Sequence, residues 1–200
     1  MPSKGERTRQ RILDRAGSIF NERGYHTTTL ADLQAATGLE KGGLYNHFGS
    51  KDDLALAAFD HNVAAVTSRV RNALTETREA VPRLVALIEA YRDFAHKPPF
   101  PGGCPILNTA VQAHAAGPKL QARVRDVMDN LLDGTVARIV QRGLERGEIR
   151  NGIDPDAVAS VMVSSIEGAL LLTDMYDDPS HFDRVADHLV EYARTLGGNE

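Results

Sequence analysis

The 200-residue sequence predicts an all-α fold of about nine helices. Apolar residues recur at intervals of three and four along most of the chain, which is the spacing of one face of an α-helix. The alternation of apolar and polar residues that marks a half-buried β-strand is not found. Apolar residues make up 42% of the chain and charged residues 25%, which is typical of a globular protein.

Capping residues and glycines mark the predicted helix boundaries. Thr28 or Thr29 can begin one helix, with Asp32 completing a capping box from Thr29, and Ser50 with Asp53 begins another in the same way. Later in the chain, an aspartate at 154 precedes a proline, which is favoured at the first helical position. Together these signals predict helices over residues 5–23, 29–38, 39–48, 50–76, 80–96, 104–114, 118–147, 154–172 and 180–196.

Targeting and membrane signals are weak. No apolar run approaches the roughly 20 residues that span a bilayer. The basic N-terminal segment "MPSKGERTRQR" is not followed by the apolar stretch of a secretory signal. The single cysteine, Cys104, excludes an intramolecular disulfide and suits a reducing compartment. We therefore expect a cytoplasmic protein that does not interact with a membrane.

Charge is distributed unevenly along the chain. The net charge is −4, yet the segment up to Lys51 holds eight basic and five acidic residues and is therefore positive by three, which leaves −7 for the remainder. Such asymmetry indicates a polyanion-binding part joined to a part with another task.

The segment "TTTLADLQAATGLEKGGLYNHFGSKDDL", residues 27–54, has the pattern of a helix-turn-helix. Two short helices joined by a turn at Gly38 would pack on the first helix, and the second would enter the DNA major groove. Gly42 and Gly43 weaken that second helix by about 1 kcal/mol each. Without a Cβ, the backbone can approach either a DNA backbone or an adjacent helix closely. The two glycines could also lie in a loop.

Several polar side chains around this second helix are candidates for DNA contact. Lys41 and Lys51 can neutralise phosphates, and Tyr45 and His47 can donate to phosphate oxygens. Asn46 or Lys41 could reach base edges. The hydroxyls of Thr28 and Thr29, at the start of the first of the two short helices, would lie on the same side. Any short amphipathic helix pair could produce a similar pattern, so spacing alone leaves the function open.

These residues resemble the DNA-binding motif of the tetracycline-repressor (TetR) family of transcriptional regulators. The run "KGGLYNHFGSKDDL" matches the family pattern "KGxLYxHFxSKxxL", and the resemblance covers roughly residues 8 to 56. It implies a DNA-binding domain over residues 1–50, with its motif at about 29–48, and a ligand-binding and dimerisation domain over residues 51–200. The DNA-contacting positions that it implies are Thr28, Thr29, Lys41, Gly42, Tyr45, His47 and Lys51.

Two positions depart from the family pattern. Members often carry a small polar residue where Glu40 stands and isoleucine where Leu33 stands. The Glu40 carboxylate could accept a hydrogen bond from a cytosine amino group. It could instead interact with the positive end of the helix dipole.

The predicted helix at residues 154–172 is apolar on most of its circumference, so it must be buried on more than one side. Its small residues, Ser164, Ser165, Gly168 and Ala169, would permit close helix approach. With the helix at 180–196 it could form a four-helix bundle with a second copy, which predicts a homodimer. Burial within one subunit is the alternative.

A small, mainly apolar effector is the ligand that the resemblance implies. Cys104 lies at a predicted helix N-cap, where the helix dipole would favour a thiolate, so a redox or electrophile sensor is an alternative to a structural cysteine. The candidate pocket residues, which cannot be separated from plain core residues by sequence, are Tyr91, Phe94, Cys104, Leu107, Val111, Met128, Met162 and Ile166.

Enzymatic and metal-binding signatures are absent from the sequence. There is no phosphate-binding glycine loop after a strand, no nucleophile-elbow serine, and no histidine pair at metal-ligand spacing. We therefore expect neither catalysis nor a cofactor nor a metal. The sequence predicts a dimeric regulator that binds a palindromic operator, with a repressor favoured over an activator. A helical adaptor that binds only protein is the alternative from another class.

Overall fold

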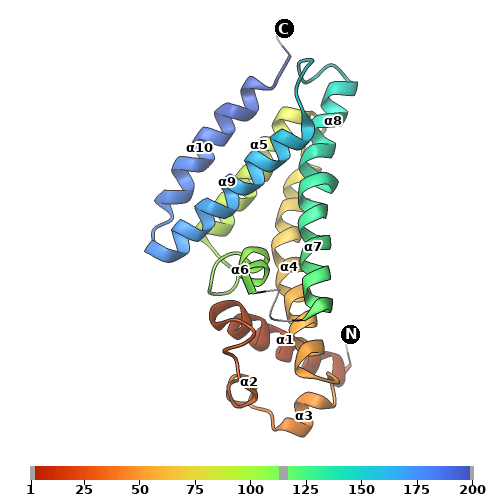
Figure 1. The fold of residues 1–200 in the computed structure, drawn as a ribbon, viewed down its shortest axis with the longest axis vertical. Coiled ribbons are helices and arrows are strands. Elements are labelled where there is room, and N and C mark those ends of the chain that lie inside the picture. Colours follow the sequence, from red (N-terminus) through yellow and green to blue (C-terminus); the bar gives the residue numbers. More distant parts are fainter. Residues whose placement is uncertain (1–2, 113–116, 199–200) are drawn as a thin grey trace. The chain divides into compact units, whose positions relative to one another are not determined.

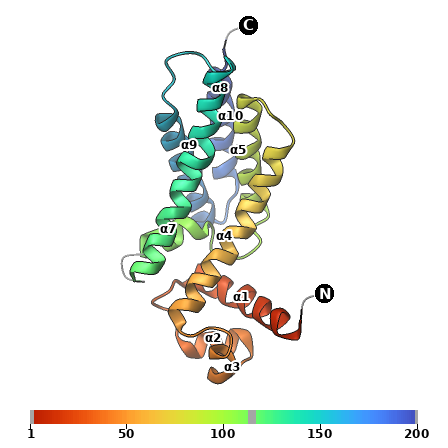
Figure 2. The same ribbon diagram turned by 90° about the vertical axis from the view of Figure 1, so that its right-hand side faces the viewer.

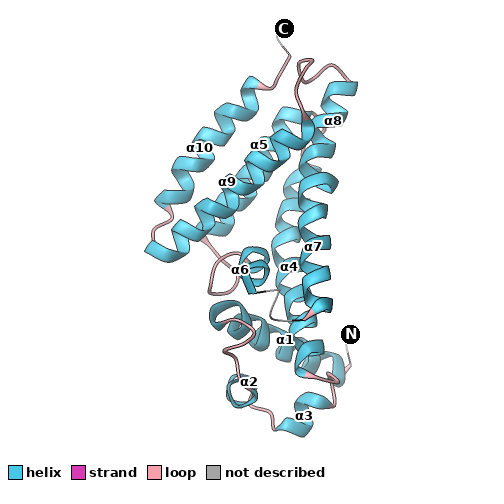
Figure 3. Ribbon diagram, viewed as in Figure 1, coloured by secondary structure: helices cyan, strands magenta, loops and turns pink. Residues whose placement is uncertain are grey.

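The computed structural model describes residues 3–112 and 117–198, and it confirms the all-α prediction (Figures 1 and 3). The stretches α7, η1 and α8 follow one another without a break, so the described residues form nine helical stretches. The helices are α1 (Lys4–Arg23), α2 (Leu30–Thr37), α3 (Lys41–Tyr45), α4 (Lys51–Thr75), α5 (Ala80–His96), α6 (Pro105–Gln112), α7 (Pro118–Leu131), η1 (Leu132–Ala137), α8 (Arg138–Glu145), α9 (Pro155–Tyr176) and α10 (Ser180–Thr195).

The described helices depart from the predicted ones in a few places. The helix predicted over 39–48 is only five residues long in the structure, and a turn follows it. The long helix predicted over 118–147 contains a π-helical stretch, η1. The end predicted for α6, at His114, lies outside the described residues, whereas α9 continues past residue 172 to Tyr176.

Packing divides the chain into two compact units. The N-terminal unit comprises Met1–Ala65 and Phe100–Arg125, and the C-terminal unit comprises Val66–Pro99 and Asp126–Glu200. The segment around α6 thus packs with the helix-turn-helix region despite its distance in the sequence. The domain boundary at residue 50 concerns which part binds DNA, and it stays a prediction.

The core of the N-terminal unit forms where α1, α2, α3 and the start of α4 meet. Helical periodicity predicts that Leu44 and Phe48, four residues apart, face inward; Leu44 lies on α3 and Phe48 follows it, and both are buried. Burial of such side chains is the main force that holds these short helices together, because helices of this length are marginal in isolation. The buried residues of this cluster are Ile12, Leu13, Ala16, Leu33, Leu44, Phe48, Leu54 and Ala58.

Two buried asparagines fasten α1 to later segments of the N-terminal unit. Asn62 on α4 donates from Nδ2 to the carbonyl oxygen of Gly17 at 3.0 Å. Asn21 donates from Nδ2 to the carbonyl oxygens of Pro101 at 2.7 Å and Gly103 at 3.1 Å. These buried hydrogen bonds tie α1 to α4 and to the loop before α6, so they help to fix where α1 lies within the unit.

The loop that Asn21 contacts approaches α1 closely at Gly102. This glycine has a φ of +88°, and a Cβ added to it would lie 2.8 Å from the carbonyl oxygen of Asn21 and 2.9 Å from the Cα of Glu22. Only glycine satisfies both conditions, since other residues are strained at such a φ and need room for a Cβ. The neighbouring Cys104 is 2% exposed.

The C-terminal unit is a bundle in which α10 packs on both α5 and α9, and α9 also packs on η1 (Figures 1 and 2). By length and composition, α9 is the one described helix that could cross a membrane. In the structure, 44% of that apolar stretch is buried inside the protein. Packing on α10 and η1 accounts for the buried part of α9, whereas several of its large apolar side chains are exposed.

Candidate DNA-binding site

The candidate site is built on α2 and α3, which are joined by a tight turn. Gly38 ends α2 in the left-handed conformation, with φ +69° and ψ 21°, and its N–H donates to the carbonyl oxygen of Gln34 at 2.8 Å. This C-terminal glycine arrangement lets the chain reverse within a few residues. Because α2 also packs on α1, the turn presents α3 from a fixed support.

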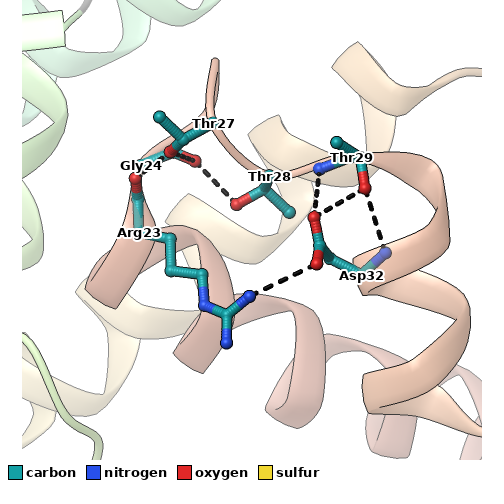
Figure 4. Close-up of polar contacts among 6 residues, drawn as sticks. All are labelled: Arg23, Gly24, Thr27, Thr28, Thr29 and Asp32. Atoms are coloured by element: carbon teal, nitrogen blue, oxygen red, sulfur yellow. Dashed lines mark hydrogen bonds and ion pairs between the residues drawn. The ribbon is translucent and has the colours of Figure 1, made fainter.

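The start of α2 is held by a reciprocal capping box, as predicted (Figure 4). The Thr29 hydroxyl accepts from the backbone N–H of Asp32 at 3.2 Å, while the Asp32 carboxylate accepts from the backbone N–H of Thr29 at 2.8 Å and from its hydroxyl at 2.6 Å. Arg23 lies 3.3 Å from the same carboxylate. These donors, first the Thr29 hydroxyl and then its N–H, hold the pKa of Asp32 below its ordinary value.

Removal of the Thr29 cap is expected to destabilise the protein. Thr29→Ala should lower the free energy of unfolding by about 1 kcal/mol, measured by urea denaturation at neutral pH. Because the folded-state pKa of Asp32 is lowered, the stability linked to its ionisation is present above the unfolded-state pKa and is lost as pH falls through the folded-state pKa. The difference from the parent should therefore shrink in acid. Thr29→Ser keeps the hydroxyl and is the control; a serine variant as unstable as the alanine variant would contradict the capping role.

The two neighbouring threonines play different parts. Thr28 is fully buried, and its hydroxyl donates to the carbonyl oxygen of Gly24 at 2.7 Å (Figure 4). Its side chain closes the loop before α2 and is not on the surface, so we do not retain Thr28 as a side-chain contact to DNA. Thr29 is exposed, although its hydroxyl is engaged by Asp32.

The predicted contacts on and after α3 lie close together on one short segment. Lys41, Gly42 and Asn46 are exposed, while Tyr45 and His47 are half-buried. The Lys41 ammonium lies 5.9 Å from the centre of the Tyr45 ring. An exposed cation, a phenol, an amide and an imidazole are thus presented within seven residues, a combination suited to phosphate oxygens and base edges.

Packing among the described residues does not explain why a glycine stands at position 42, within α3. A Cβ added there would meet no atom within 4 Å, and the residue does not have a positive φ. The alternative that an adjacent helix requires this glycine is therefore excluded within the described structure. A close approach by a molecule outside the chain, such as DNA, stays the prediction for this glycine.

Lys51 is more deeply engaged in the fold than the other predicted contacts. Its Nζ donates to the carbonyl oxygen of Tyr25 at 2.7 Å and lies 4.4 Å from the centre of the Tyr25 ring. Burial lowers the pKa of Lys51, with Asp52 acting in the opposite direction. Burial also raises the pKa of Tyr25 to about 12, assisted by its hydrogen bond to Asp52. A phosphate contact by the remaining Lys51 donors stays a prediction.

Two contacts beside α3 were missed by sequence reasoning. Gln34 donates from Nε2 to the Glu40 carboxylate at 3.1 Å, across the turn between α2 and α3. This contact holds an acidic group beside the start of α3, where Glu40 makes no capping hydrogen bond of its own. The Arg9 guanidinium on α1 lies 4.9 Å from the centre of the Phe48 ring. The basic character of the N-terminal segment was the signal that could have identified Arg9.

The predicted pocket residues are divided between the two units. Tyr91, Phe94, Met162 and Ile166 are buried in the C-terminal unit, where α5 and α9 pack, and Met128 is half-buried in the same unit. The other three, Cys104, Leu107 and Val111, belong to the N-terminal unit. Val111 is 72% exposed, which makes it a surface residue in the described structure rather than part of a pocket lining. Within the described residues, no group of three or more metal-ligating side chains is found.

Helices α2 and α3, which share a core with α1 and expose Lys41, form a helix-turn-helix. This unit is typical of regulators of transcription. A family model described as bacterial regulatory proteins of the tetR family matches residues 12–58. A second, described as the tetracyclin repressor-like C-terminal domain, matches residues 80–189, more than half of the chain. The chain belongs to the TetR family of transcriptional regulators.

Individual relatives extend over nearly the whole chain. The crystal structure of a TetR regulator from Chloroflexus aurantiacus is 40% identical, with a TM-score of 0.90, and the match covers 97% of this chain and 98% of that one. An uncharacterised HTH-type regulator of Bacillus subtilis, YezE, is 30% identical over 89% of this chain and 90% of its own length. The HTH-type transcriptional repressor DhaR of a Mycobacterium species is 26% identical over 82% of this chain and 80% of its own.

Proposed function

We propose that this protein is a cytoplasmic, homodimeric repressor that binds a palindromic DNA operator and leaves it when a small, mainly apolar effector binds. The observation that supports operator binding best is the exposed segment around Gly42, where open space above the backbone coincides with Lys41, Tyr45, Asn46 and His47. The name of the relative DhaR describes a repressor, which favours repression here.

An exposed apolar stripe on α9 supports dimerisation. Val161 is 47% exposed, Leu171 47%, Met175 63% and Tyr176 61%, and they recur at helical spacing along one face. Gly168 lies between them, and a Cβ there would meet no atom within 4 Å in the single chain. Exposed apolar residues along one face of a helix, with small residues between them, indicate a protein interface, and a second copy satisfies it through two-fold symmetry.

A dimer also suits the proposed target. Two copies of α3 related by two-fold symmetry would meet half-sites about one DNA turn apart, roughly 34 Å, which is why the operator should be palindromic. The effector would bind among the apolar side chains that α5 and α9 contribute to the C-terminal unit. Its coupling to DNA must be reciprocal, so an effector that weakens operator binding itself binds the DNA-loaded dimer less well. The burial of Cys104 gives no support to the alternative of thiol sensing.

Selection of binding sites from random duplexes, followed by a salt titration, tests this proposal. We expect recovery of an inverted repeat; a single half-site would contradict the dimer. On the selected duplex, Lys41→Ala should reduce the slope of log affinity against log salt by about 1, because one phosphate contact is lost.

Lys97→Ala removes the same charge from an exposed position at the end of α5 and is the matched control. Its slope should equal that of the parent protein. Equal slopes for all three proteins would remove Lys41 from the phosphate contacts, and the absence of retention on any duplex at low salt would favour a protein-binding adaptor instead.

A further inference from the structure

A cleft in the C-terminal unit is lined by five arginines that the proposed function does not use. It has a volume of about 210 Å³ and is formed by the end of α4, the start of α5, η1 and α8. Among its lining residues Glu148 is the one acidic side chain. The arginines are Arg78, Arg83, Arg138, Arg142 and Arg146.

The single acidic residue of the cleft is already engaged. The Glu148 Oε2 atom accepts from the backbone N–H of Ala80 at 2.7 Å, at the first residue of α5, and its Oε1 atom lies 3.6 Å from Arg146. The other four arginines have no carboxylate partner within 4.0 Å among the described residues. The cleft therefore carries an uncompensated positive charge, to which the N-terminal end of α5 adds its dipole.

One of these arginines carries a buried donor without a partner in the described part of the chain. Arg83 is half-buried, and its Nε atom is shielded from solvent with no hydrogen-bond partner among the described residues. A buried donor without an acceptor is unfavourable, and in native proteins such groups usually have a partner. Arg83 also lines the cleft, and a small anion fits a volume of about 210 Å³ whereas a duplex does not.

The arrangement on α8 points the same way. Arg138 and Arg142 lie one turn apart on one face of α8, and Arg146, four residues further on, is the residue that caps the C-terminal end of this helix. Attraction to the helix C-terminus explains arginines in the last turn, but it does not explain Arg138 or the convergence of Arg78 and Arg83 from other segments. Like charges held together at a concave surface are characteristic of an anion-binding site.

We propose that this cleft binds a small oxyanion carrying at least two negative charges, either a phosphate compound or a polycarboxylate. The planar guanidinium groups match such oxyanions through paired N–H donors. Gly134 and Thr135 bring the π-helical stretch η1 to the edge of the cleft, and η1 packs on α9. A bound anion would thus lie against a segment that contacts α9, the helix of the proposed dimer interface. π-helical insertions are frequently found at functional sites.

Isothermal titration calorimetry of the full chain without DNA tests this site independently of the proposed function. We expect saturable binding, one per chain, of pyrophosphate or citrate at constant ionic strength, and none of acetate. Pyrophosphate alone identifies the ligand as a phosphate compound, and citrate alone identifies it as a polycarboxylate. The R138Q/R142Q variant should weaken binding at least about tenfold, because two charged hydrogen-bond donors are lost.

The R125Q/R184Q variant is the matched control, since both arginines are exposed and outside the cleft. Its affinity should stay within about twofold of the parent, since only long-range charge changes. R83Q, which removes the shielded donor, should also weaken binding. The absence of saturable binding by both polyanions, acetate binding of equal strength, or an equal loss in the control variant would overturn the proposal.

Discussion

Gly42→Ala is expected to make the protein more stable and a weaker DNA binder. The open space above Gly42 admits a methyl group without a clash, so the free energy of unfolding should rise by up to about 1 kcal/mol through helix propensity. On the selected operator, the same methyl group would occupy the space that we assign to the DNA backbone. We expect affinity to fall at least about tenfold, equivalent to about 1.4 kcal/mol, measured by fluorescence anisotropy at fixed salt.

The opposite signs of these two effects separate a functional glycine from a structural one. Gly5→Ala is the control, because Gly5 is also helical and exposed, with only Ser3 Oγ at 3.9 Å from an added Cβ. It should stabilise the protein without changing DNA affinity. A Gly42→Ala variant that binds the operator as tightly as the parent would show that this glycine does not face DNA.

Gly102→Ala is expected to destabilise the N-terminal unit strongly. The residue has a φ of +88°, and an added Cβ would lie within 3.0 Å of three backbone atoms of Asn21 and Glu22. Backbone strain of about 1–2 kcal/mol and overpacking of about 1–3 kcal/mol together predict a loss of about 3 kcal/mol. Chemical denaturation followed by circular dichroism measures it.

Gly152→Ala isolates the packing part of that loss. Gly152 has nearly the same φ, +85°, but nothing lies within 4 Å of an added Cβ. It should therefore lose only the strain contribution, about 1–2 kcal/mol. If the two variants were equally destabilised, the close approach of the Gly102 loop to α1 would not contribute to the loss of stability.

Local signals in the sequence were sufficient for most helix boundaries. The Thr29–Asp32 and Ser50–Asp53 pairs form the expected side-chain to backbone hydrogen bonds, and Asp154 caps α9 through the N–H of Asp156 at 3.0 Å. Such interactions involve residues two or three apart, so sequence spacing determines them. The inward positions of α3 were equally predictable, because helical periodicity defines a face.

Features that depend on distant residues were not predictable in this way. Thr28 and Thr29 are equivalent by spacing, and only burial against the rest of the unit distinguishes them. Lys51 reads as a surface cation, yet it contacts a carbonyl 26 residues earlier in the chain. The arginine cleft brings together segments that are far apart in the sequence, which local spacing does not reveal.

Because Cys104 is buried, the reactivity of its thiol reports local opening of the N-terminal unit. It is the single sulfhydryl in the sequence, and it sits 2% exposed beside the loop that fastens α1. An alkylating reagent can therefore modify the native protein only during transient openings of this region. The alkylation rate then reports how often the N-terminal unit loosens, in the presence or absence of an operator, without any engineered label.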